Sequence, residues 1–188
     1  MKNLVAIIAS SSLLVLSAHP SASSQSVGAG ETEIHCDGQP ELLATYLEMS
    51  QVLFNERKGE LVGKFYKDKF ISHNVDEGGI GVRKVALEDM QAMWRRFEQI
   101  EPDREVINNL IVCKDDIVVA QVTTTGTHIG EGLVGNPQEG RRYKTSAIDI
   151  YRFEDGKVVE RWGNNDRVAK ARQLGQTIDL SFEPIKPD

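Results

Sequence analysis

The sequence predicts an α+β fold: a curved antiparallel sheet with helices that close an apolar pocket. The first half of the chain has two runs of helical period, and the second half has four extended runs in succession. Helices followed by consecutive strands are typical of α+β proteins. The turns between the extended runs are short, and tight links join antiparallel neighbours.

Length and composition are those of one soluble domain. The chain has 188 residues, of which 40% are hydrophobic and 27% charged, and its formal net charge is −6. A single domain of roughly 100–200 residues is the default at this length. An acidic chain without a basic cluster argues against partners such as nucleic acid or an anionic membrane surface.

Residues 1–26 have the pattern of a secretory signal peptide. Lys2 supplies a positive start, Leu4–Leu16 an apolar core, and Ala18–Ser24 a small-residue cleavage region. The apolar run is shorter than the about 20 residues that span a bilayer. We therefore expect a secreted or periplasmic protein, with no membrane attachment after cleavage and one domain over residues 27–188 (core 41–175). The alternative is an uncleaved anchor or a disordered start.

Two cysteines leave two interpretations open. Cys36 and Cys113 could pair in an oxidising compartment. Alternatively, Cys113 is a small buried hydrophobe within an apolar run.

The expected helices follow from apolar residues at three- and four-residue steps. The first runs over Glu41–Lys58 and ends at Gly59, and a short helix follows at Leu61–Tyr66. Arg83–Phe97 is the second long helix. A last helix covers Asp166–Leu174, with Asn164 or Asn165 as its N-cap and Gly175 as its stop.

The expected strands are separated by turn residues. A short strand precedes the second long helix, the stretch from Asp76 to Gly81 is expected to be a loop, and Val27–Gln39 is a polar lead-in. The strands are Lys69–Val75, Arg104–Cys113, Ile117–His128, Arg142–Phe153 and Lys157–Trp162.

Asp149 is the strongest candidate for chemistry because it lies within a core-like strand. Alternation places it on one face with aromatic and small residues: Tyr143, Thr145, Ala147, Tyr151 and Phe153. A buried carboxylate without a partner costs several kcal/mol. It is therefore a general base facing a cavity, whose pKa burial would raise, half of a structural pair with Arg142 or Arg152, or an aspartate that caps a bend.

Other polar residues could serve the same site. His128 ends an apolar stripe and could donate to an oxyanion or orient Asp149; alternatively it is a turn histidine that bonds the backbone of residues 130–132. Asn74 could donate an uncharged hydrogen bond to an oxyanion, and His73 could bind substrate beside it. The alternative for both is a strand end with satisfied polar groups.

Aromatic residues could line the pocket. Tyr143 and Tyr151 share the face of Asp149. Trp162 and Trp94 are either walls of the pocket or plain core. His73 with Asp76 and Glu77 is weak as a metal cluster, so we expect no metal site.

The motifs together resemble a known family. They are Phe70-Ile71-Ser72-His73-Asn74, Gly126-Thr127-His128, Ala147-Ile148-Asp149-Ile150-Tyr151-Arg152-Phe153, Asp155-Gly156-Lys157-Val158-Val159-Glu160, and Trp162 with Asp166 and Gln173-Leu174-Gly175. Their order and spacing, over about Glu41 to Gly175, resemble the SnoaL-like polyketide cyclases of the nuclear-transport-factor-2-like superfamily. The resemblance implies a cone-shaped barrel with a deep apolar pocket, commonly a homo-oligomer, and neither a metal nor an organic cofactor.

The resemblance also implies a reaction. Cyclases of this family close a ring by an intramolecular aldol step, in which an aspartate removes a proton next to a carbonyl. Asp149 is the best match for that base, with His128 and Asn74 as partners. We predict a cofactor-free cyclase, isomerase or lyase that acts on a small apolar carbonyl compound. The alternatives are an exported protein that binds a small apolar ligand without chemistry and a scaffold with a closed pocket.

Overall fold

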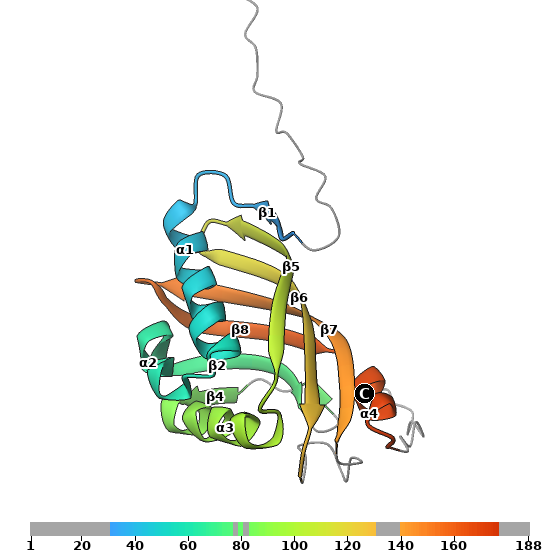
Figure 1. The fold of residues 1–188 in the computed structure, drawn as a ribbon. Coiled ribbons are helices and arrows are strands. Elements are labelled where there is room, and N and C mark those ends of the chain that lie inside the picture. Colours follow the sequence, from blue (N-terminus) through green and yellow to red (C-terminus); the bar gives the residue numbers. More distant parts are fainter. Residues whose placement is uncertain (1–30, 77–78, 81–82, 131–139, 177–188) are drawn as a thin grey trace, which may run out of the picture.

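The computed structural model describes residues 31–76, 79–80, 83–130 and 140–176, so the predicted signal peptide lies outside the described residues. The fold is mixed α+β, with a single curved, unclosed sheet in which antiparallel pairs predominate. Helices α1 to α3 lie against one face of the sheet, and α4 lies beside one end of β7 (Figure 1). The predicted fold class is confirmed.

The helices are close to those expected, except that one segment expected to be helical forms a strand. They are α1 (Pro40–Met49), continued by a π-helical stretch at Ser50–Asn55, a 3₁₀ turn at Gly59–Leu61, α2 (Val62–Phe65), α3 (Leu87–Ile100) and α4 (Arg167–Gln173). Arg83–Ala86, expected as the first turn of the second long helix, forms strand β4 instead, because its backbone pairs with β2. Within the described residues, no helix has the length and apolar character needed to cross a bilayer.

The strands form one continuous order, β1-β5-β6-β7-β8-β2-β3, with β4 also paired to β2. β1 pairs with β5, and β2 with β8, in parallel; the other pairs are antiparallel. The strands are β1 (Glu33–His35), β2 (Tyr66–Asp76), β3 (Gly79–Ile80), β5 (Glu105–Lys114), β6 (Ile117–His128), β7 (Arg141–Glu154) and β8 (Lys157–Asn165).

Three details differ from the expected elements. The polar lead-in contains β1, which is too short to show a period of its own. The expected loop after β2 contains β3, which pairs back onto β2. The N-cap of α4 is Asp166, whose Oδ1 accepts a hydrogen bond from the Ala169 amide (2.8 Å), because Asn164 and Asn165 still belong to β8.

The core lies between the helices and the inner face of the sheet, the face against which α1 to α3 pack. Cys36 and Cys113 form a disulfide within the packing of this core, and Cys113 is only 8% exposed, so both interpretations of Cys113 hold. The bridge closes a loop of 77 residues, which the chain-entropy account values at about 4 kcal/mol. The fully buried aromatic residues Tyr46, Phe65, Tyr66 and Tyr151 fill the centre of this core.

Candidate active site

Asp149 points into the core from β7, as the alternation predicted. Its side chain is 11% exposed, and its Oδ1 accepts a hydrogen bond from the guanidinium of Arg161 on β8, at 2.6 Å. The partner is therefore neither Arg142 nor Arg152. The Arg161 side chain is 18% exposed, so both halves of this ion pair retain some accessible surface.

A bulge in the β7–β8 hairpin brings Arg161 to the inner face. Near the turn the register is regular, with Phe153 opposite Val158, but Arg152 lies opposite Glu160. The extra residue, Val159, shifts the pairing by one position. Because side chains alternate with period two, such a shift exchanges the two faces of the strand. Beyond the bulge, Arg161 and Gly163 face inward, and Trp162 faces outward.

Three buried tyrosines surround the Asp149–Arg161 pair. The guanidinium carbon of Arg161 lies 5.9 Å from the ring centre of Tyr151, whose ring is 5.7 Å from that of Tyr46. The Tyr46 hydroxyl donates to Asn108 Oδ1 at 2.7 Å. Burial, together with the charge of Asp149, raises the pKa of Tyr46 and of Tyr151, so these phenols stay protonated donors at neutral pH.

The same environment keeps Arg161 charged. Burial acts to lower its pKa, but the negative charge of Asp149 together with Tyr151 and Tyr66 outweighs burial and raises the pKa above its ordinary value. Burial likewise raises the pKa of the third tyrosine, Tyr66. The pair therefore supplies one fixed cation beside a carboxylate, in a setting of neutral phenols.

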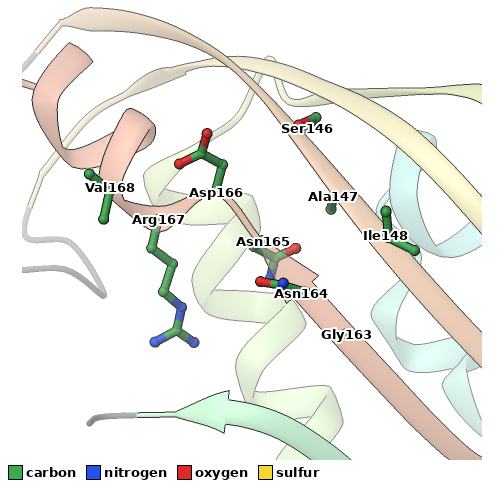
Figure 2. A pocket seen from close by; sticks show the side chains of 9 residues that line it. All are labelled: Ser146, Ala147, Ile148, Gly163, Asn164, Asn165, Asp166, Arg167 and Val168. Atoms are coloured by element: carbon green, nitrogen blue, oxygen red, sulfur yellow. The ribbon is translucent and has the colours of Figure 1, made fainter.

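A cavity of about 520 Å³ lies along neighbouring positions of β7 and β8, and Asp149 is not among the residues that line it. Its wall includes Gly163, the residue opposite Asp149, and Ala147, two positions before it on the same face. Figure 2 shows the lining side chains, which come from β7, the end of β8 and the start of α4: Ser146, Ala147, Ile148, Asn164, Asn165, Asp166, Arg167 and Val168. The volume lies within the range of small-molecule sites.

His128 lies in a different cluster. It pairs with Arg141, eight positions along β7 from Asp149, which is roughly 26 Å at about 3.3 Å a residue. Its Nε2–H donates to the carbonyl oxygen of Gly130 at 2.9 Å, the turn contact left open as the alternative. Its Nδ1 is buried 3.7 Å from Oε1 of Glu101. The structure thus corrects the predicted convergence of His128 on Asp149.

Glu101 is the centre of this second cluster. The carboxylate is 1% exposed, accepts a hydrogen bond from the Tyr143 hydroxyl (2.6 Å) and forms an ion pair with Lys170 of α4. Arg104 Nε lies 3.8 Å from its Oε2. Burial acts to raise the pKa of Glu101, but Lys170, Tyr143 and Arg104 together lower it below the ordinary value. The cluster ties α4 to the end of α3.

His73 and Trp162 lie on the outer face of the sheet, opposite to Asp149. Their rings stack at 4.8 Å, and His73 Nε2 lies 2.7 Å from Glu160 Oε1. Arg152 covers the Trp162 ring and approaches Glu160 at 3.3 Å. The predicted substrate-binding role of these two rings at the site of Asp149 is therefore corrected, and the physical reason is the bulge.

The remaining candidates fall into three places. The backbone of Asn74 pairs with Gly163, which also pairs with Asp149, so Asn74 lies two strands from Asp149. Tyr143 shares the inner face with Asp149 but belongs to the Glu101 cluster. Trp94 is core: it is 4% exposed and stacks on Phe54 at 5.4 Å. Of the weak metal cluster, Glu77 lies outside the described residues.

The sequence of the chain matches that of a known protein family. The sequence profile of SnoaL-like polyketide cyclases matches residues 44–174. The chain belongs to this family. No curated protein matches the SnoaL-like chain.

Solved structures share the fold of this SnoaL-like chain. AclR of Streptomyces galilaeus, described as a candidate hydroxylase, is 26% identical, with 75% of this chain and 89% of AclR covered and a TM-score of 0.60. IdmH of Streptomyces antibioticus, described as a candidate polyketide cyclase, is 23% identical, with coverages of 72% and 99% and a TM-score of 0.60. A candidate polyketide cyclase of Acidithiobacillus ferrooxidans is 19% identical, with coverages of 74% and 97% and a TM-score of 0.64.

Sequence reasoning missed four residues at the two clusters of this SnoaL-like chain. Arg161 and Gly163 were hidden by the bulge, which no turn residue announces. Glu101 and Lys170 carry no local pattern that marks them as a buried pair. The signal available for Arg161 was its place in the strand that follows the strand of Asp149 and pairs with it through a short turn.

Proposed function

We propose that this SnoaL-like protein is a cofactor-free cyclase, isomerase or lyase that acts by acid–base catalysis on a small carbonyl compound. Asp149 removes a proton from the carbon next to the carbonyl. The family membership supports the class of reaction, and the geometry of β7 and β8 supports the base.

The observation that carries the proposal is the largely buried carboxylate of Asp149, which is held by Arg161 on the inner face of the sheet. A cavity of about 520 Å³ has in its wall Gly163, the residue opposite Asp149, and Ala147. Ile148, on the outer face of the sheet, and Val168 add apolar wall to this cavity, while Asn164 and Asn165 add amide groups that can bind a carbonyl oxygen.

Proton abstraction can be tested without the natural substrate. We would incubate the protein in heavy water with a panel of aryl ketones, β-diketones and keto esters, and follow deuterium uptake next to the carbonyl by mass spectrometry. Uptake should exceed the buffer rate for at least one compound. Gly163→Val, which places a side chain in the cavity, should abolish this excess.

The alternative is a binding protein with the same pocket, and it predicts a different result. Native mass spectrometry would then show a retained small molecule or a bound panel member, with no deuterium uptake and no product. Binding that Gly163→Val abolishes, without exchange by the wild-type protein, would refute the enzymatic proposal.

We further propose that the protein is exported, as the leader pattern predicts, and that it is a homo-oligomer. A Cys36–Cys113 disulfide is consistent with an oxidising compartment. The outer face of the sheet exposes Ile107 (42%) and Ile148 (51%), which favours a second copy as its cover. Light scattering on the mature protein should give a mass above that of one chain, and Ile148→Lys should lower it.

A further inference from the structure

Helix α4 covers an edge of β7 that β8 leaves bare. The pairing of β7 with β8 ends where Ala147 lies opposite Asn165, so the β8 side of residues 141–146 has no strand partner among the described residues. We propose that α4 is a detachable wall of the cavity: it undocks from β7 as a unit while the rest of the fold stays intact, and the cavity is complete only while α4 is docked. This motion does not depend on the reaction proposed above.

The side-chain amide of Gln173 takes the place of a neighbouring strand on this edge. The Lys144 amide donates to Gln173 Oε1 at 2.8 Å, and Gln173 Nε2 donates to the Lys144 carbonyl at 3.0 Å. Further along the edge, the Asp166 amide donates to the Ser146 carbonyl at 3.1 Å. Lys144 and Gln173 are exposed, so water can replace these bonds when α4 leaves. Undocking therefore does not leave these backbone groups buried without a partner.

The cavity depends on α4 for part of its wall. One side consists of residues 146–148 of β7, and Asp166, Arg167 and Val168 at the start of α4 form another (Figure 2). The hydrogen bond from the Asp166 amide to Ser146 joins these two sides, because both residues line the cavity. Movement of α4 away from β7 would open the cavity along this line.

The interior contacts of α4 can also be released without stranding a charge. Lys170 forms an ion pair with Glu101 and lies 4.0 Å from the ring centre of Tyr143, and Leu174 is 2% exposed. When Lys170 leaves, it returns to water. Glu101 keeps the hydrogen bond from Tyr143 and the nearby guanidinium of Arg104. The open state thus avoids the large cost of a buried charge without a partner.

Helix α4 is too short to persist on its own. It has seven residues, and isolated helices shorter than about 12–15 residues are marginal in water. Its helical hydrogen bonds therefore depend on docking, and the helix and its contacts should be lost in one step. The ladder between β5 and β6 does not involve α4. Undocking is therefore a local opening, whose free energy lies below that of global unfolding.

Hydrogen exchange followed by NMR in low concentrations of urea tests this motion in the wild-type protein. The reporters are the amides of Lys144 on the β7 edge, Asp166 at the cavity wall, and Lys170, which donates to the Asp166 carbonyl at 3.1 Å. After correction for intrinsic rates, all three should exchange through one opening that depends little on urea. They should exchange at least about tenfold faster than the amides of the β5–β6 ladder, which need global unfolding.

Two results in the wild-type protein would overturn the inference. The first is exchange of the three reporters only at the rate of the β5–β6 ladder, because α4 would then open with the whole fold. The second is an Asp166 amide that stays protected while Lys170 exchanges, because the cavity wall would then not move with α4.

Gln173→Ala and Arg172→Ala form a matched pair of variants. Both place alanine in α4, so helix propensity is not reduced, and of the two side chains Gln173 bonds Lys144. Gln173→Ala should speed exchange at Asp166 and Lys170 by at least about fivefold, as expected for two lost hydrogen bonds, and leave the β5–β6 ladder unchanged. Arg172 is exposed, and its replacement should change these rates by less than about twofold. Equal effects of the two variants, or an equal acceleration of the β5–β6 ladder by Gln173→Ala, would disprove the role of α4.

Discussion

Asp149→Asn should lower the rate of proton abstraction by about 10²–10⁴-fold, the range that a positioned acid–base group contributes. The asparagine can still accept a hydrogen bond from Arg161, which the structure places 2.6 Å from Oδ1. Substrate affinity should therefore fall much less than the rate, or even rise for an anionic ligand. The measurement is the rate of deuterium uptake at saturating substrate, beside the melting temperature of each variant.

His128→Gln separates this arrangement from the one that the sequence predicted. The structure places His128 with Glu101 and the carbonyl of Gly130, roughly 26 Å along the strands from Asp149. Its replacement should leave the rate within a few-fold of wild type once the fraction of folded protein is taken into account. A loss as large as that of Asp149→Asn would place His128 back in the reaction, and wild-type exchange in Asp149→Asn would disprove the base assignment.

Glu101→Gln should reduce the free energy of unfolding by about 3 kcal/mol at neutral pH, the lower end of the cost of removing one partner from a buried ion pair. The change leaves Lys170 and Arg104 close together without their carboxylate. Urea denaturation followed by tryptophan fluorescence measures the loss.

The matched controls use pairs of different burial. Glu48→Gln removes the carboxylate of the Glu48–Lys64 pair, whose side chains are about half exposed, and should cost less than about 1 kcal/mol. Adding Lys170→Met to Glu101→Gln should recover part of the loss, since the stranded cation is removed as well. Equal effects of Glu48→Gln and Glu101→Gln would contradict the central role of the buried cluster.

The stability difference between wild type and Glu101→Gln should depend on pH, in a direction set by the lowered pKa of Glu101. The folded pKa of Glu101 lies below its ordinary value of 4.5, so its stabilisation is complete above that pH and is lost as pH falls through the folded value. The groups that face it are Lys170, Arg104, Tyr143 and His128. The stability gap between wild type and Glu101→Gln should therefore shrink on acidification below about pH 4.

The fold class and the inward direction of Asp149 could be predicted from the sequence because they depend on local periods. The alternation of β6 and β7 predicts which side chains are buried, and the structure bears this out from Val118 to His128 and at Asp149. The partners could not be predicted this way. A single extra residue at Val159 decides whether Arg161 or Trp162 faces Asp149, and local composition does not reveal it.

The sequence also could not predict which of the candidate side chains lie close together in space. His128 and Asp149 both face inward, but sharing a face of a sheet does not bring residues together when eight positions separate their places along the strands. Glu101 and Lys170 meet although they come from separate helix-terminal regions, and only the packing of α4 against β7 joins them. Register and packing, both long-range, set the composition of each cluster.

The three-residue strand β1 has a consequence for the solubility of the folded protein. It pairs with Leu110, Ile111 and Val112 of β5, at the end of the sheet order. An uncovered edge rich in β-branched residues is a template on which other chains can add as further strands. The disulfide from Cys36 to Cys113 anchors β1 over part of that edge. The covalent link thus guards against aggregation as well as adding stability.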